Sequence, residues 1–306
     1  MARRWDAKMG SYFCAGPKPS LTLLAAAFTT LVAVACGGPP PIRTLGPHPA
    51  YLEADLATLI KRANAWTSSS LKANGQLRLY WAGNEDDRHV NAHLFATRTG
   101  ALRMQGDRGL VGNIFDLASN GDTFLLRIPS RRTDYKGISA APAVPDPARP
   151  YFALRPQHLT EALLPEPLPE TTVGEPGSFV SREVYPDRYA LDWWQKRPGG
   201  QTVLRRRVWI ERVTLRVARV ESFRADGRID FQATYANYLG PGPDAYPGMI
   251  RVERPWEDLV FRFDLEEIEH DPVLPSGAFT LRPAKGYRLT TIEEGMKENG
   301  AKRNTG

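Results

Sequence analysis

Apolar and polar side chains alternate along most of the chain with the two-residue period of a β-strand. In residues 71–81 the odd positions are mostly apolar and the even positions are polar, beginning with Leu71 and Lys72. The same alternation predicts further strands within residues 89–98, 101–105, 113–119, 122–129, 133–138, 178–185, 188–195, 202–211, 214–223, 228–238, 249–256 and 258–269. About a dozen short strands of this kind predict a mainly β fold.

Two segments follow the period of an α-helix instead. Residues 51–66 place their apolar side chains on one helical face, and residues 155–164 carry a proline in the first turn. Tight hairpin turns are predicted at residues 120–121 and 226–227, because Asn-Gly and Asp-Gly pairs adopt the left-handed backbone that short turns require. The chain is therefore expected to be mainly β with a few helices.

Two short helices offer too little surface to cover so many one-sided strands. We expect a single strongly curved antiparallel sheet that forms an incomplete β-barrel covered by helices, with an interior that is either filled or left as an apolar hollow. An apolar hollow would be a binding site. The residues expected to line it, or to pack as core beside it, are Leu71, Leu77, Leu79, Trp81, Leu94, Phe124, Leu126, Phe231, Tyr235, Phe261 and Phe263.

An uncharged apolar run, residues 21–35, follows a basic leader and ends directly before Cys36. The run is short for a membrane span, and the small residues at its end are typical of a cleaved signal peptide. The letters VAVAC followed by two glycines resemble a bacterial lipobox, in which the cysteine is acylated and becomes the mature N-terminus. We expect residues 1–35 to be a lipoprotein signal peptide and Cys36 to carry the lipid; an uncleaved anchor or plain secretion is the alternative.

The predicted organisation continues with a Pro/Gly-rich tether at 36–49, one domain at 50–292 and a polar tail at 293–306. The full chain has a net charge of +6, and the chain after residue 35 keeps 36 basic against 33 acidic side chains. So small an excess gives no reason to expect nucleic acid as a partner. Two or more acyl chains would tether such a domain stably to a membrane.

No sequence motif of an enzyme stands out. The other cysteine, Cys14, lies in the leader, and glycine-serine elbows, phosphate-binding loops and zinc-binding His-Glu helices are missing from the sequence. His89 and His93 share a strand face but lack further ligands at fitting spacing, so an exposed face explains them better than a metal. The acidic residues 85–87 fit a solvated turn. We expect no enzyme, cofactor or metal, although a hydrolase with two dispersed carboxylates leaves no spacing pattern to exclude it.

Two runs within the predicted strands must divide between the faces of the sheet. At least one of residues 205–207, all arginine, should point to the less polar side and need an acceptor there, either at a solvated edge strand or at the mouth of an anion-binding cavity. Of Trp193 and Trp194 only one can face inward, as core or as cavity wall.

The loop at residues 106–113 holds two apolar side chains, Leu110 and Val111, among glycines and polar residues. Such side chains either fold back onto the core or project outward. A projecting leucine would gain about 2 kcal/mol on burial, which suits a transient contact with lipid or with a partner.

The passages FDLASNGDTFLLRIPSRRTDYKG (115–137) and LPSGAFTLRPAKGY (274–287), with the apolar hairpin loop before them, resemble the outer-membrane lipoprotein carrier and receptor superfamily, the LolA/LolB-like proteins. The resemblance implies an incomplete β-barrel closed by helices, whose apolar interior holds the acyl chains of lipoproteins in transit. It implies that a lipid on Cys36 places the chain on the receptor side, and that Leu110 corresponds to the exposed leucine of the receptor's membrane-insertion loop.

Together these observations favour a lipid-anchored protein of the bacterial envelope, facing the periplasm from the outer membrane. We expect it to be a monomer that binds acylated lipoproteins or lipids, receives them from a soluble periplasmic carrier and assists their delivery. A scaffold that senses stray lipid with the same fold is the first alternative. An envelope hydrolase is the second, and it predicts a polar cleft with close carboxylates.

Overall fold

The structure is a computed structural model. It describes residues 50–66, 68–81, 89–140, 155–170, 177–242, 245–255, 259–275 and 277–292, which belong to one compact unit, Pro49–Gly306. The predicted signal peptide, tether and polar tail (1–35, 36–49 and 293–306) lie outside the described residues, as do Cys36 and the acidic turn 85–87.

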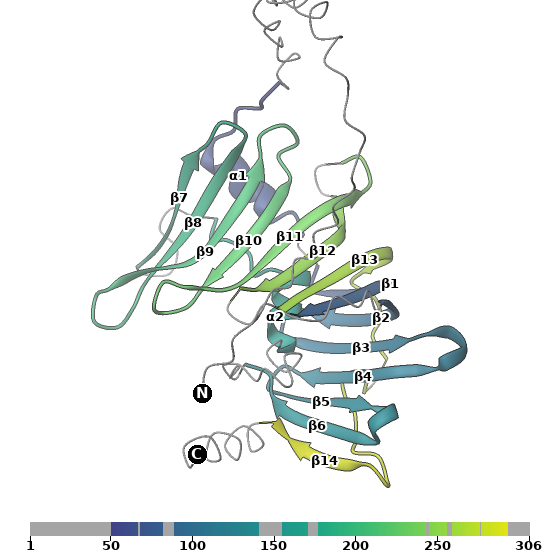
Figure 1. The fold of residues 1–306 in the computed structure, drawn as a ribbon. Coiled ribbons are helices and arrows are strands. Elements are labelled where there is room, and N and C mark those ends of the chain that lie inside the picture. Colours follow the sequence, from purple (N-terminus) through teal and green to yellow (C-terminus); the bar gives the residue numbers. More distant parts are fainter. Residues whose placement is uncertain are drawn as a thin grey trace, which may run out of the picture. The chain divides into compact units, whose positions relative to one another are not determined.

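The strands of the described chain pair into one curved, open sheet of fourteen strands (Figure 1). Its order is β14-β6-β5-β4-β3-β2-β1-β13-β12-β11-β10-β9-β8-β7. The strands are β1 (Ser70–Trp81), β2 (His89–Thr97), β3 (Ala101–Asp107), β4 (Asn113–Asn120), β5 (Thr123–Ile128), β6 (Thr133–Ile138), β7 (Ser178–Val184), β8 (Arg188–Lys196), β9 (Thr202–Glu211), β10 (Val217–Phe223), β11 (Ile229–Leu239), β12 (Tyr246–Arg254), β13 (Leu259–His270) and β14 (Arg288–Thr291). The open curved sheet confirms the predicted fold class.

Each strand buries one face because its apolar residues recur at every second position. In β13, Phe261 and Phe263 are buried, while Arg262 and Asp264 between and beside them face the other side and bind each other at 2.7 Å. Side chains of this kind from thirteen strands, β1 to β13, form a single apolar cluster with the helices. The sheet therefore has an apolar inner face and a polar outer face.

Helix α1 (Leu56–Ala63) is shorter than the helix predicted over 51–66. Asp55 caps it, because its side chain accepts a hydrogen bond from the Thr58 N–H at 2.8 Å. The preceding residues are extended instead, and the Leu52 N–H bonds the carbonyl of Arg212 at 2.8 Å. The predicted helix start at residue 51 was wrong. The helical spacing of apolar residues extends back to residue 51, but this segment pairs with the turn after β9 instead of forming a helix.

Helix α2 (Pro156–Leu163) agrees with the prediction of 155–164. Pro156 occupies the first turn, and the His158 side chain accepts the backbone N–H of Arg155 at 3.1 Å, which satisfies a donor at the helix start. This helix contacts β2, β3 and β12, whereas α1 contacts β9. In the described part of the chain, no helix is long and apolar enough to cross a membrane.

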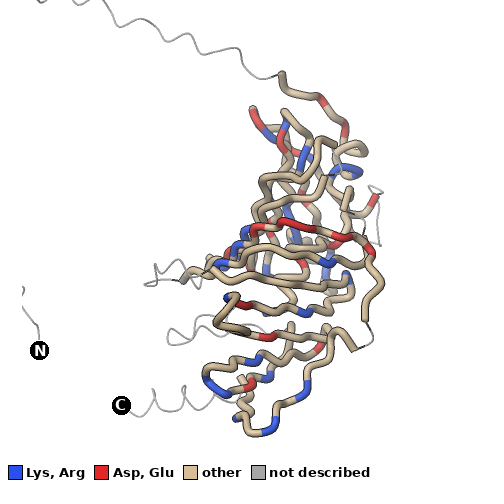
Figure 2. Tube along the Cα trace, turned by 90° about the vertical axis from the view of Figure 1, so that its right-hand side faces the viewer, with Lys and Arg blue, Asp and Glu red and all other residues tan. Residues whose placement is uncertain are grey.

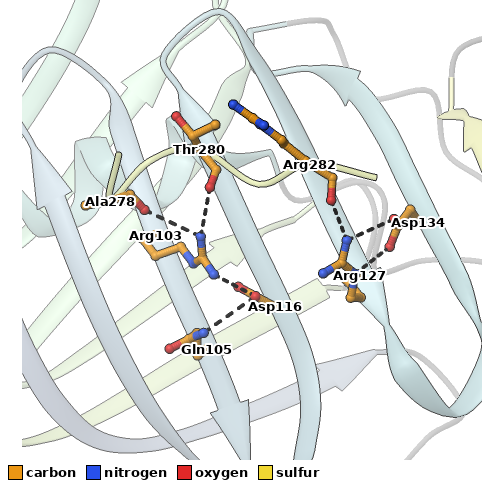
Figure 3. Close-up of polar contacts among 8 residues, drawn as sticks. All are labelled: Arg103, Gln105, Asp116, Arg127, Asp134, Ala278, Thr280 and Arg282. Atoms are coloured by element: carbon orange, nitrogen blue, oxygen red, sulfur yellow. Dashed lines mark hydrogen bonds and ion pairs between the residues drawn. The ribbon is translucent and has the colours of Figure 1, made fainter. Parts of the chain in front are cut away.

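The chain between β13 and β14 crosses the outer face of the sheet, and we call residues 277–287 the C-terminal strap. Arg103 on β3 donates to the carbonyls of Ala278 and Thr280 at 3.5 and 3.3 Å (Figure 3). Further along, Arg127 on β5 donates to the carbonyl of Arg282 at 2.6 Å. The strap leads into β14, which pairs with β6 in parallel, so the expectation of a wholly antiparallel sheet was wrong at this edge.

Candidate functional site

The predicted cavity residues lie together on the inner face of the sheet. Eight of them are buried members of the apolar cluster, and Leu79 and Leu126 are partly buried against it. The eight are Leu71, Leu77, Leu94, Phe124, Phe231, Tyr235, Phe261 and Phe263. Trp81 ends β1, but its side chain is outside what the structure describes. These residues are therefore brought into one apolar region that α1 and α2 cover, and their role as lining stays a prediction.

Trp66, which follows α1, joins this region although the cavity prediction did not include it. Its ring packs against Tyr235 at 4.9 Å and Tyr246 at 5.5 Å between centroids, and its indole N–H bonds the carbonyl of Ala245 at 3.2 Å. Such an aromatic cluster adds specific geometry to apolar burial. Its spacing in the sequence, 66 against 235 and 246, gives no pattern that could have predicted it.

The two helices and the residues that follow each, 64–66 and 164–168, form what we call the cover. Asn64 joins the two halves of the cover, because its side chain bonds both the carbonyl and the N–H of Leu168 at 2.8 Å. Arg98, in the turn after β2, donates to the carbonyl of Pro165 and, at 2.6 Å, to that of Trp66. Burial lowers the pKa of Arg98, which nevertheless remains charged at neutral pH. One guanidinium thus holds the ends of both helices.

The last turn of α2 and the residues after it are held to the sheet by donors directed at their carbonyl groups. The hydroxyl of Tyr235 donates to Ala162 at 3.0 Å, that of Tyr246 donates to Leu163, and Arg206 donates to the carbonyl of Glu166 at 2.5 Å. Burial raises the pKa of Tyr235, so its hydroxyl keeps the proton that it donates. These contacts satisfy the carbonyls that a helix end leaves without intrahelical partners.

Arg206 also answers the prediction for the arginine run. It is buried under the ring of Trp193, whereas Arg207 faces outward and pairs with Asp192 at 2.6 Å through two bonds. Trp193 is likewise the inward tryptophan, and Trp194 bonds Ser181 on the outer face. The prediction that one arginine and one tryptophan point inward is confirmed.

A cluster of ionisable groups lies between the start of α2 and the ends of β11 and β12. His158 Nε2 is 2.7 Å from Arg254 Nη1 and 3.5 Å from Asp230 Oδ2. Burial lowers the pKa of His158, and the hydrogen bond with His158 lowers the pKa of Asp230. The cluster therefore holds a neutral imidazole beside an ion pair. It does not contain the two neighbouring carboxylates that a hydrolase of the predicted kind requires.

The loop between β3 and β4 projects into solvent. Leu110 and Val111 lie in a short 3-10 turn, Gly109–Val111, and expose 109% and 74% of their surface. Gly109 and Gly112 have φ of 47° and 82°, left-handed values that favour glycine. Asp107 accepts the Gly109 N–H at 3.0 Å, which lowers the pKa of Asp107. The two apolar side chains of this loop therefore project outward and do not fold back onto the core.

His93 lies on the exposed outer face of β2, where it contacts Asn74 at 2.9 Å and Asp107 at 3.4 Å. Within the described ranges, no group of three His, Cys, Asp or Glu side chains is placed to hold a metal ion.

No protein-family model matches the chain, and no curated protein matches it either. Solved structures do. One is a LolA superfamily protein from Nitrosomonas europaea, with 14% identity and a TM-score of 0.45, over 75% of this chain and 99% of the other. Another is a DUF1329 family protein from Desulfovibrio piger, with 12% identity and a TM-score of 0.47, over 73% and 95%. The first belongs to the superfamily that the sequence motifs resemble.

Proposed function

We propose that this protein is a lipid-anchored member of the bacterial envelope that binds acyl chains of lipoproteins or lipids against the apolar inner face of its sheet. It receives them from a soluble periplasmic carrier, assists their delivery to the outer membrane and acts as a monomer. Cys36 carries its own lipid, and no bond of the cargo is made or broken. The observation that carries the proposal is the apolar inner face beneath a cover that packs on it and is also held by hydrogen bonds to backbone groups.

The chemistry of the cover supports binding of an apolar ligand. The contacts of Arg98 and Asn64 within the cover run to backbone groups, which water can satisfy when the cover moves away. A net hydrogen bond of this kind contributes only about 1 kcal/mol, or somewhat more where the donor is charged. The apolar face, in contrast, is unfavourable in water and would remain shielded if acyl chains took the place of the cover. Displacement of the cover by lipid is therefore the expected binding step.

The projecting loop supports a role in delivery. An exposed leucine and valine gain free energy on entering the apolar part of a bilayer, about 2 kcal/mol for one leucine. This energy is small enough for contact to be reversible, as repeated delivery requires. Leu110 and Val111 are the proposed insertion residues.

A lipid-sensing scaffold would share the inner face and is the second candidate. The exposure of Leu110 favours delivery, because a sensor has no need of an apolar tip that enters membranes. An acyl-bound protein that fails to transfer cargo would favour the sensor instead.

The test uses residues 37–306, which retain every described residue of the compact unit. This protein should bind a fluorescent fatty-acyl probe, and absence of binding would refute the proposal. Leu110→Glu should keep probe binding but impair delivery of acylated cargo to vesicles. The matched control is Val273→Glu, because Val273 is 98% exposed in the loop after β13, at the opposite strand ends from Leu110. Equal loss of delivery in both variants would contradict a specific role for the Leu110 loop.

A further inference from the structure

Six exposed cationic side chains gather at the β14 edge of the sheet, on two segments that the parallel pairing joins. We call them the basic edge: Arg131, Arg132, Lys136, Arg282, Lys285 and Arg288. The Arg288 N–H bonds the carbonyl of Arg132 at 2.9 Å, which fixes the two segments side by side. In Figure 2, Lys and Arg dominate the lowest part of the tube, where β6 and β14 lie.

The acidic residues of the same segments do little to neutralise this charge. Residues 121–139 and 277–291 contain two of them, Asp122 and Asp134. Asp134 is 0% exposed and already accepts two bonds from Arg127, at 2.9 and 3.1 Å (Figure 3). It also accepts one from the Ala284 N–H at 2.7 Å. Arg127 in turn is occupied by Asp134 and by the strap. All six side chains of the basic edge are exposed to the solvent.

The basic edge lies at the same strand ends as the exposed apolar loop. Asp116 on β4 pairs with Arg127 on β5, so the β3–β4 and β5–β6 hairpins are neighbours whose turns leave the sheet in one direction (Figure 1). Strands are about 4.8 Å apart, so neighbouring hairpin turns lie on the order of 10 Å apart. Arg131 and Arg132 are in the β5–β6 turn, and Arg288 begins β14 beside it. Arg108, also exposed, immediately precedes the Leu110 turn.

An apolar tip flanked by cations fits the boundary of a bilayer that carries anionic lipid. The apolar side chains enter the acyl region, while lysine and arginine remain at the level of the headgroups and bind phosphate. Guanidinium groups suit this contact because they bind phosphate oxygens through two parallel hydrogen bonds. An acidic protein surface would use the cations but would leave Leu110 and Val111 without an apolar environment.

We propose that the basic edge binds the anionic headgroups of the membrane that the Leu110 loop enters, and so makes delivery selective for anionic lipid. This inference rests on the proposed function, because it assigns the lipid class to the proposed insertion loop. It adds a second, electrostatic contribution to membrane binding that the loop alone lacks.

The experiment measures binding of residues 37–306 to two kinds of vesicle, pure phosphatidylcholine and phosphatidylcholine with about a third phosphatidylglycerol. The unaltered protein should prefer the anionic vesicles and lose the preference between about 0.1 M and about 0.5 M salt, since salt screens exposed charges. The triple variant Arg132→Gln, Lys285→Gln, Arg288→Gln should bind anionic vesicles at least about tenfold more weakly and neutral vesicles equally well.

The control removes the same number of exposed cations from turns that lie elsewhere on the sheet: Lys196→Gln, Arg197→Gln and Arg224→Gln. This variant should retain the preference for anionic vesicles. An equal loss in the control would overturn the inference, as would an unaltered protein with no preference for anionic vesicles, a result that needs no variant to fold.

The two proposals fail differently. If Leu110→Glu weakens binding to both kinds of vesicle while the triple variant has no effect, the basic edge does not bind lipid and the proposed function stands. If the acyl probe does not bind the unaltered protein, the proposed function fails whatever the vesicles show. Retention of vesicle binding with loss of binding to an acidic carrier protein would assign the basic edge to a protein partner and overturn the inference.

Discussion

Arg98→Met removes the guanidinium that holds both halves of the cover while keeping a long side chain at the position. The guanidinium reaches the carbonyls of Trp66, Ser68 and Pro165, and the contacts to the first two measure 2.6 and 2.9 Å. Hydrogen bonds from a charged donor contribute about 1.5–3 kcal/mol each in buried surroundings. Because Arg98 is only half-buried, water recovers part of this, and we expect a loss of about 3 kcal/mol in the free energy of unfolding.

The same change should raise the affinity for acyl chains. If lipid binds only after the cover has moved, the apparent Kd equals the intrinsic Kd divided by the fraction of protein with the cover open. A less firmly held cover is open more often, and 1.4 kcal/mol corresponds to a factor of ten. A cost of about 3 kcal/mol on the closed form therefore predicts up to roughly 100-fold tighter probe binding.

The assay pairs urea unfolding with titration of the fatty-acyl probe, on residues 37–306 with and without the substitution. Arg98→Lys is the control, since one ammonium can reach one carbonyl and should give an intermediate value in both measurements. Lower stability combined with weaker or unchanged probe binding would refute the reasoning, because the inner face would then not be reached by displacing the cover.

Three further substitutions test other parts of the structure. Asp134→Asn should lower the free energy of unfolding by about 2 kcal/mol, because Arg127 loses its charged partner and the strap loses the carboxylate that accepts the Ala284 N–H. The strap leads into β14, so hydrogen exchange in β14 should become faster, and unchanged exchange would contradict this. Lowering the pH from 7 to 5 should cost up to about 2 kcal/mol, because unfolded histidine, with its usual pKa near 6.5, takes up a proton that buried His158 resists; the loss should shrink in His158→Gln, and equal pH slopes would refute the assignment. Gly75→Ala should cost about 1–3 kcal/mol in thermal unfolding, because the new Cβ would lie 2.1 Å from the carbonyl oxygen of Asp264; a neutral result would contradict the tight approach of β1 and β13.

The fold was predictable wherever one local pattern determines one element. Alternation in β13 gave its inner face, and the Asn-Gly and Asp-Gly pairs gave turns in which Gly121 and Gly227 have φ of 102° and 81°. The start of α1 was missed because Asp55 had to be recognised as a cap against continuing helical spacing. The parallel pairing of β14 with β6 joins residues about 150 positions apart, and local patterns carry no information on such pairs.

The inner face of the candidate site was predictable for the same reason, since Phe231 and Tyr235 recur with the strand period. The hydrogen bonds that hold the cover in place could not be predicted from the sequence. Arg98 lies in a turn, where a charged side chain is expected to be solvated, and its partners are backbone carbonyls, which every residue possesses. The strap was similar: Arg103 and Arg127 look like outward residues of an exposed strand until the chain that crosses them is known.

The two proposed activities use different surfaces, a buried apolar face for acyl binding and an exposed loop with the basic edge for delivery. Substitutions can therefore test them separately. In the two proposals, acyl binding would depend on the inner face and on the bonds from Arg98 to carbonyl groups, whereas delivery would depend on the exposed Leu110 and the exposed basic edge. Because these two sets share no residue, their substitutions should be additive in free energy. A double variant, Arg98→Met with Leu110→Glu, should therefore bind the probe as tightly as Arg98→Met alone and deliver no better than Leu110→Glu alone. Coupling between the two substitutions would refute this independence, because the conformation of the loop would then depend on the state of the cover.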